Sequence, residues 1–432
     1  MKMQLDRIDE KSFDDALILL RRDLHKYPEC GWTEYRTTVK VFGPQIHTPA
    51  HRYGMPPPDM LTACEQRAIE ETGRPDLIER MKGGFTGCVA EILGSRPGPT
   101  VAFRFDLDCN DAEEADDPQH RPAREGFRST HPNLVHACGH DGHTAIGIGA
   151  AQILTQYRDQ LAGRVIFVFQ PAEEGLRGAN SLTQAGIFRD VDYLVGGHIG
   201  LKLGRLGVIA ASGHGFLAST KFDVTFQGKA AHAGVSPEEG HNALAAASTA
   251  VLNLLAIPRH GAGSSRINIG TLHAGTGRNV VPERAVMAIE TRGGTGAINE
   301  YMEAHAQRIC RAAAEMYECE YESRFMGAAG SAVCSPELAR FVMKSAAELS
   351  GVTEVLEDID FGGGEDITYM INDVQAHGGM ATEMMLGTEI SAPHHNGRFD
   401  FDERVIGLGA RLFAKLALDL SDQGPLVASD RK

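Results

Sequence analysis

Residues 136–143, with the sequence HACGHDGH, place one thiol, three imidazoles and one carboxylate within eight positions. A Cys and a His two positions apart can bind one divalent ion, and the remaining groups are near enough to bind or support a second. Alternatively, the stretch is a polar turn that caps a helix beginning near Thr144, with Asp141 as its N-terminal anion. A metal site needs further ligands from distant parts of the chain, so this stretch constrains the fold to supply them.

Three predicted strands end in side chains that could complete such a site. The pattern predicts strands over residues 100–105, 164–169 and 193–197, and the second is so continuously apolar that we expect it to be central and parallel. Ligands bind at the carboxyl ends of the strands in an α/β sheet. Those ends carry Asp106 and Asp108, Glu173 and Glu174, and His198. The two aspartates could instead belong to a solvated turn, but together the five residues predict a site at one sheet edge.

Two features lie near the N-terminus. Residues 13–26 have the periodicity of an amphipathic helix, and His25 at its end is expected to be a structural partner for a backbone carbonyl. Residues 54–84 contain three consecutive prolines followed by a charged helical run. This segment resembles an insertion that covers something.

The chain changes character after residue 215. The hydrophobic pattern between 216 and 328 predicts the order strand, helix, strand, strand, helix, strand, which is the ferredoxin-like arrangement. The expected strands are 220–227, 266–272, 284–290 and 320–325, and the expected helices are 241–257 and 297–317. A chain of 432 residues is long enough for two domains. We therefore predict an α/β domain with a central mixed sheet, made of residues 1–215 and 329–432, and an inserted α+β domain at 216–328.

Composition and absent motifs argue against several functions. A formal net charge of −15 disfavours nucleic acid or an anionic membrane as a partner. No apolar run is long enough to span a bilayer, and the first thirteen residues lack the apolar core of a signal peptide. Eight scattered cysteines favour reduced thiols and a cytoplasmic protein. Neither a phosphate-binding glycine loop nor a GxSxG elbow is present, which argues against nucleotide and serine-hydrolase chemistry.

The two adjacent glutamates can divide the work of a metal pair. Glu174 would bind metal, and Glu173 would act as the general base that takes a proton from water. The chain offers enough further ligands for two ions, namely Cys138, His140, His198 and His395. A mixture of Cys, His and Glu suits zinc best, and manganese or cobalt is also acceptable. His394 competes with His395 for one ligand position.

Seven motifs follow one another along the chain: RFDLD, HACGHDGH, QPAEEG, GKAAHAG, GTGRNVVPE, ETRGG and HHNGRFDFDE. In this combination the chain resembles the metallo-amidohydrolases that include hippurate hydrolases, N-acyl-amino-acid deacylases and plant auxin-conjugate hydrolases. The resemblance extends from about residue 15 to about residue 420. Within the family, the sequence is most similar to hydrolases of p-aminobenzoyl-glutamate and indole-3-acetyl-aspartate.

The resemblance implies a metallopeptidase-like catalytic domain with two divalent ions, zinc or manganese, and an inserted lid that forms a dimer. Cys138 would bridge the ions, with His140, Glu174, His198 and His395 as further ligands, Glu173 as the base and Asp108 orienting a ligand. His232 would enter the active site of the neighbouring chain and steady the carbonyl oxygen. Asn279 and Arg292 would hold the substrate, although Arg292 could also be a solvated charge at a strand end.

The implied reaction hydrolyses the amide of an N-acyl acidic amino acid, such as indole-3-acetyl-aspartate or p-aminobenzoyl-glutamate, to the aromatic acid and Asp or Glu. Three alternatives stay open: a broader deacylase or dipeptidase, a subunit of a heteromeric hydrolase that is inactive alone, and a metal-sequestering protein. The expected partners are this small molecule and a second copy of the chain or a related subunit. Cys109 and Gly397 replace residues common in the family, which leaves the substrate preference open.

Overall fold

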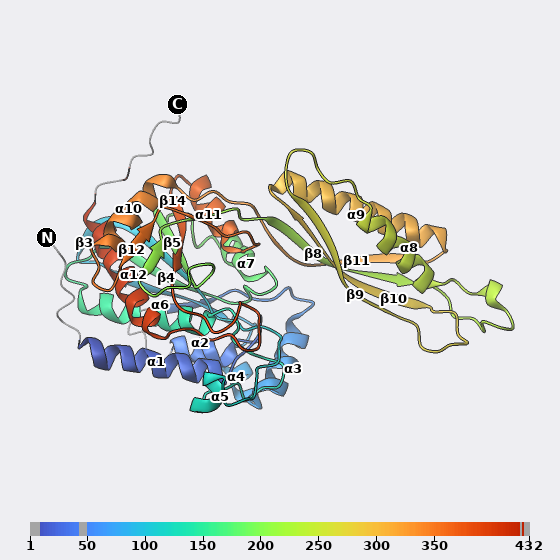
Figure 1. The fold of residues 1–432 in the computed structure, drawn as a ribbon, viewed down its shortest axis with the longest axis horizontal. Helices are drawn as coiled ribbons and strands as arrows, with labels where there is room; N and C mark the ends of the chain where they lie inside the picture. The colour runs from blue at the N-terminus through green and yellow to red at the C-terminus, as the bar shows by residue number, and fades with distance from the viewer. Residues whose placement is uncertain (1–8, 43–49, 424–425, 427–432) are drawn as a thin grey trace.

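The computed structural model describes residues 9–42, 50–423 and 426, which form two bodies (Figure 1). The larger body is built around an eight-stranded sheet, and the smaller one around a four-stranded sheet. Figure 1 shows the smaller body projecting to one side of the larger one, to which β8 and β11 connect it. In the described part of the chain, every helix is too short or too polar to cross a membrane.

The large sheet is mixed, as predicted. Its strand order is β1-β2-β4-β3-β5-β14-β6-β12. The strands are β1 (Ala50–Tyr53), β2 (Gly87–Leu93), β3 (Arg96–Asp106), β4 (Ala162–Gln170), β5 (Tyr193–Ile199), β6 (Val208–Ala210), β12 (Glu354–Leu356) and β14 (Met380–Leu386). The apolar strand β4 is internal and parallel to β3 but antiparallel to β2, so the expectation of a purely parallel strand was wrong on one side. Burial of both faces makes the strand apolar, whichever way its neighbours run.

Helices cover both faces of this sheet. On one face, α1 (Glu10–Lys26), α6 (His140–Gln156), α10 (Pro336–Ala347) and α12 (Arg404–Asp422) enclose a core that includes Phe103, Phe105, Phe167 and Phe169. On the other, α7 (Gly178–Gln184) and α11 (Ile367–Ala376) pack on Ala102, Ile166 and Val168. Successive residues of a strand point to opposite faces, which explains how β3 and β4 serve both cores. The remaining elements of this body are α2 (Tyr35–Phe42), α3 (Leu61–Thr72), α4 (Pro75–Arg80), α5 (Arg121–Glu125), β7 (Gly213–His214) and β13 (Ile359–Asp360).

Helix α6 begins at His140, four residues earlier than a start near Thr144. Gly139 precedes it with a φ of 92°, a left-handed conformation that glycine adopts without a steric penalty. A Cβ atom at Gly147 would come within 2.6 Å of Phe105, so the absent side chain lets the helix pack closely on the sheet. The first turn of α6 is thereby held against the carboxyl ends of the strands.

The small body has the predicted ferredoxin-like arrangement. Its antiparallel strands follow the order β11-β8-β10-β9, and the helices α8 and α9 share a core with the sheet. The elements are β8 (Ala218–Gln227), η1 (Pro237–Glu239), α8 (Ala243–Leu255), β9 (Ser265–Ala274), β10 (Arg284–Gly293), α9 (Gly296–Met316) and β11 (Glu320–Ala329). We retain 1–215, 216–328 and 329–432 as the proposed domain division and refer to the small body as the lid.

Candidate metal centre

Residues from four separate parts of the chain meet at the carboxyl edge of the large sheet. Their potential donor atoms form three groups, each within 4.8 Å: Cys138, His140 and His198; Cys138, Glu174 and His395; His140, Glu173 and Glu174. Cys138 belongs to the first two groups, which is the arrangement that a thiolate shared by two cations requires. Its Sγ atom lies 3.4 Å from Nε2 of His198.

Two buried atoms of this cluster have no hydrogen-bond partner. They are Nε2 of His140 and Oε1 of Glu174, which lie 4.0 Å apart. Nε2 of His395 approaches the same glutamate oxygen to 3.3 Å. Buried polar atoms are rarely left unpaired, and a nitrogen and a carboxylate oxygen facing a thiol match the ligands of a borderline-soft divalent ion. The residues present therefore fit a metal pair.

Hydrogen bonds fix which nitrogen each histidine presents to the cluster. Nδ1 of His140 donates to the backbone oxygen of Asp108 at 2.8 Å, and Nδ1 of His198 donates to the oxygen of Ile199 at 2.9 Å. Both rings therefore present Nε2. Burial, together with the neighbouring His143 and His394, holds the pKa of His198 well below its usual range. The neutral ring is the form that binds metal.

The two other histidines near the cluster are already hydrogen-bonded to protein. Nδ1 of His143 lies 2.6 Å from the carboxylate of Asp106, and its Nε2 accepts from the backbone N–H of Ile199 at 2.8 Å. His394 directs Nε2 to the carbonyl oxygen of Ile199 at 3.0 Å, whereas His395 lies in the donor group with Cys138. These contacts favour His395 over its neighbour as a ligand.

Asp108 holds the turn that carries the two glutamates. Its carboxylate accepts the backbone N–H groups of Glu173 at 3.0 Å and of Glu174 at 2.9 Å. The preceding Ala172 has a φ of 52°, and its N–H donates to the buried carboxylate of Glu34 at 2.7 Å. Asp108 thus acts on the candidate ligand and base through the backbone, in addition to its carbonyl contact with His140.

Glu173 has the surroundings of a proton acceptor. Burial raises the pKa of its carboxyl group well above the usual range, and the charges of Glu365 and Glu174 raise it further. Arg104 pairs with Glu365 at 2.8 Å and with Asp366 at 3.3 Å. A carboxylate that gains proton affinity from burial is suited to take a proton from a nucleophile and to return it.

A buried charge network behind the first turn of α6 was missed by the sequence analysis. Asp141 contacts Nε of Arg21 at 2.8 Å and Nδ1 of His25 at 2.8 Å, and the same imidazole contacts Glu114 at 2.9 Å. The expected carbonyl partner of His25 is therefore wrong, because two carboxylates occupy its ring nitrogens. The i, i+4 spacing of Arg21 and His25 was the one available signal, since it places both on one helix face.

The lid residues His232 and Asn279 do not join this cluster within one chain. Both are exposed, on two loops that pair through the N–H of Ala233 and the oxygen of Asn279 at 3.0 Å. These loops follow the end of β8 and precede the start of β10, and those ends lie farthest from the larger body in Figure 1. Arg292 lies at the near end of β10, where its guanidinium pairs with Glu290 at 3.0 Å.

Comparisons with known proteins show what this chain is similar to. The sequence profile of peptidase family M20/M25/M40 matches residues 102–419. The indole-3-acetyl-aspartic acid hydrolase of Enterobacter agglomerans is 46% identical over 413 residues, which cover 92% of this chain and 94% of that protein. One of the subunits of the p-aminobenzoyl-glutamate hydrolase of Escherichia coli K12 is 43% identical over 412 residues, with the same coverage of 92% and 94%.

Two solved structures extend the comparison to the fold. The aminobenzoyl-glutamate utilization protein of Klebsiella pneumoniae has a TM-score of 0.79 at 39% identity, covering 98% of this chain and 100% of that one. A Bacillus subtilis protein described as a dinuclear metal binding peptidase has a TM-score of 0.66 at 26% identity, covering 95% and 99%. Both similarities include the lid as well as the larger body.

Proposed function

This chain belongs to peptidase family M20/M25/M40, and we propose that it hydrolyses the amide bond between an aromatic acyl group and an acidic amino acid. Indole-3-acetyl-aspartate and p-aminobenzoyl-glutamate are the leading substrates, since the two bacterial relatives above are named for them. The observation that carries the proposal is the position of Cys138 between two groups of metal-ligating side chains.

We assign two divalent ions to this centre, zinc or manganese, held by Cys138, His140, Glu174, His198 and His395. Such ions supply Lewis acidity, which polarises an amide carbonyl and lets water act as a nucleophile near neutral pH. Asp108 keeps Glu174 and Glu173 in register through the two backbone hydrogen bonds. This division leaves Glu173 free of any ligand role.

Glu173 would take the proton from the attacking water and transfer it to the nitrogen of the leaving amino acid. Its raised proton affinity supports both halves of that transfer. His232 and Asn279 would reach the reacting carbonyl from the lid of a second chain, because their loops lie far from the centre of their own. Arg292 would bind the carboxylate of the amino acid, exchanging its bond to Glu290 for the substrate. We therefore propose a homodimer as the active form.

The E. coli relative is named as part of a larger hydrolase, which favours one alternative, namely activity only with a related second chain. Purified protein, reconstituted with zinc or manganese, should be assayed against a panel of N-acyl aspartates and glutamates, N-acetyl amino acids and dipeptides. Hydrolysis of the aromatic acyl conjugates by this chain alone supports the proposal. Metal-loaded but inactive protein would support the heteromer, and equal rates across the panel would support a broader deacylase or dipeptidase.

We also propose the cytoplasm as the compartment, on the ground that the eight cysteines are all unpaired thiols and seven of them are buried.

A further inference from the structure

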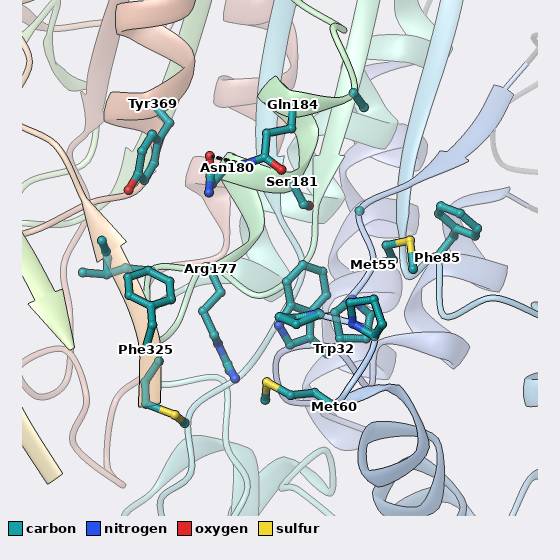
Figure 2. A pocket seen from close by; sticks show the side chains of 18 residues that line it. Trp32, Met55, Met60, Phe85, Arg177, Asn180, Ser181, Gln184, Phe325 and Tyr369 are labelled. Atoms are coloured by element: carbon teal, nitrogen blue, oxygen red, sulfur yellow. Dashed lines mark hydrogen bonds between the residues drawn. The ribbon is translucent and has the colours of Figure 1, made fainter. Parts of the chain in front are cut away.

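A cavity of about 550 Å³ lies between the catalytic body and the lid strand β11 (Figure 2). Trp32, Phe85 and the proline-rich segment 54–60 form one wall, and Phe325 and Met326 of β11 form another. This volume is typical of small-molecule sites. Aromatic, methionine and proline side chains predominate, so the cavity suits a planar apolar group. The segment 54–84, which the sequence analysis describes as a covering insertion, thus contributes part of a cavity wall.

Arg177 gives this lining its charge. Figure 2 shows Arg177 extending between Phe325 and Trp32. Arg177 is the one charged residue of the lining, and no carboxylate in the described ranges forms an ion pair with it, although its Nη2 donates to a backbone oxygen. A positive charge in an apolar lining, without a carboxylate to pair with it, favours a ligand that carries a negative charge.

This cavity is separate from the metal centre. None of its lining residues belongs to the donor groups described above. The turn of residues 174–177 lies between the two sites, because Glu174 joins the metal cluster while Arg177 lines the cavity and donates to the backbone oxygen of Glu174 at 3.3 Å. The N–H of Ala328 in β11 donates to the oxygen of Leu176 at 2.9 Å. A ligand here would therefore contact both the lid and the turn that carries Glu174.

We propose that this cavity binds a free aromatic carboxylic acid. The ring lies among Trp32, Met60 and Phe325, and the carboxylate accepts from the guanidinium of Arg177. An amide-linked acyl group would fill the apolar walls equally well, but it brings no negative charge to Arg177. The guanidinium, which has no carboxylate partner in the described ranges, therefore favours the free acid over the acyl group of an intact substrate.

The source of the ligand, though not the site, rests on the proposed function. Hydrolysis of an aromatic acyl amide releases an aromatic carboxylate, so the cavity would bind the product of the neighbouring metal centre. An aromatic carboxylate that a different enzyme produces would fit the cavity in the same way. Adding the acid to assays of the active enzyme separates these sources, since a product site predicts tighter binding of the acid that the enzyme itself releases than of other aromatic acids.

The chain provides its own reporter for this site, because Trp32 is its single tryptophan. Benzoate should be titrated into the metal-free full-length protein while indole fluorescence is recorded, with calorimetry as a second readout. Removing the ions prevents a carboxylate from binding at the metal centre and makes the test independent of catalysis. Benzamide, which has the same shape without the charge, is the matched ligand control.

Saturable quenching or shift of the Trp32 emission by benzoate is expected, with benzamide binding about tenfold or more weakly. Arg177→Met should weaken benzoate binding about ten- to a hundredfold and remove the preference over benzamide. Phe325→Ala, on a side chain that is 61% exposed in the lid, should weaken both ligands with little risk to folding. Circular dichroism verifies that each variant is folded.

Equal affinity for benzoate and benzamide would overturn the proposal and assign the cavity to an uncharged acyl group. An unchanged benzoate affinity in folded Arg177→Met, or the absence of any response in both fluorescence and calorimetry, would also overturn it. Neither result bears on amide hydrolysis, which the substrate panel tests separately.

Discussion

His140 donates its Nδ1 hydrogen to the backbone oxygen of Asp108 at 2.8 Å, across 32 positions of sequence. The bond joins the first turn of α6 to the end of β3 and aims Nε2, which has no hydrogen-bond partner, at the candidate metal centre. The side chain of Asp108 meanwhile holds the glutamate turn after β4. One residue thus positions parts of the site that come from two other elements.

Asp108→Asn tests this positioning role. The amide keeps the size of the side chain but offers one acceptor oxygen to two backbone N–H groups, so one of these bonds is lost. We expect zinc affinity to fall about 10- to 100-fold and the free energy of unfolding to fall by roughly 1–3 kcal/mol. Chelator competition and urea denaturation measure the two effects. Glu113→Gln, on an exposed neighbour, is the matched control, and wild-type affinity in Asp108→Asn would contradict the role.

Glu173 and Glu174 are adjacent but have different predicted roles. Glu173→Gln should retain the bound metal and lower kcat by about 10²- to 10⁴-fold, because it removes the proton acceptor. Glu174→Gln should lose metal affinity, because it replaces an anionic ligand with a neutral amide. Elemental analysis and steady-state kinetics of both proteins measure these outcomes. Equal metal loss in the two variants would refute the division.

The dimer makes a prediction that no single-chain mechanism shares. His232→Ala should be inactive as a homodimer, as should Glu173→Gln. Mixing the two after dissociation should restore activity, because a hybrid dimer then contains one centre with an intact Glu173 and an intact His232 from the partner. The control is each variant dissociated and reassociated alone. If the mixture stays inactive although hybrid dimers have formed, an active site shared between two chains is excluded.

The charge network behind α6 should appear in the acid stability of the fold. Burial opposes ionisation of Glu114, but hydrogen bonds from His120 and His25 prevail and lower its pKa from 4.5 to about 2. A depressed pKa stabilises the folded state above pH 4.5, and that contribution is lost as the pH falls towards 2. Glu114→Gln should therefore cost roughly 2–3 kcal/mol at neutral pH and progressively less between pH 4.5 and 2. Denaturant titrations across this range measure the difference, and a constant difference would contradict the assignment.

The local sequence pattern was enough to predict a candidate site at the edge of the large sheet and the fold of the lid. The apolar run of β4 and the spacing of potential ligands around Cys138 are properties of short segments, so they are visible in sequence. The early start of α6 at His140 depends on the left-handed conformation of Gly139, which the pattern did not indicate.

Contacts between distant segments were not predictable in the same way. Asp141 meets Arg21 across 120 positions, and a charged residue gives no sequence signal that it will be buried beside another. The cavity of Trp32 and Arg177 likewise joins the N-terminal region, the segment after β4 and the lid strand β11. Side chains of this kind become a site only once the chain has folded.

Metal stoichiometry of the wild type and of Cys138→Ala, measured by elemental analysis after reconstitution and desalting, tests the central claim most directly. We predict two ions per wild-type chain and a loss of both in the variant, together with its activity, because a shared thiolate joins the two donor groups. Two tightly bound ions in folded Cys138→Ala, or none in the wild type, would contradict a metal pair centred on this cysteine.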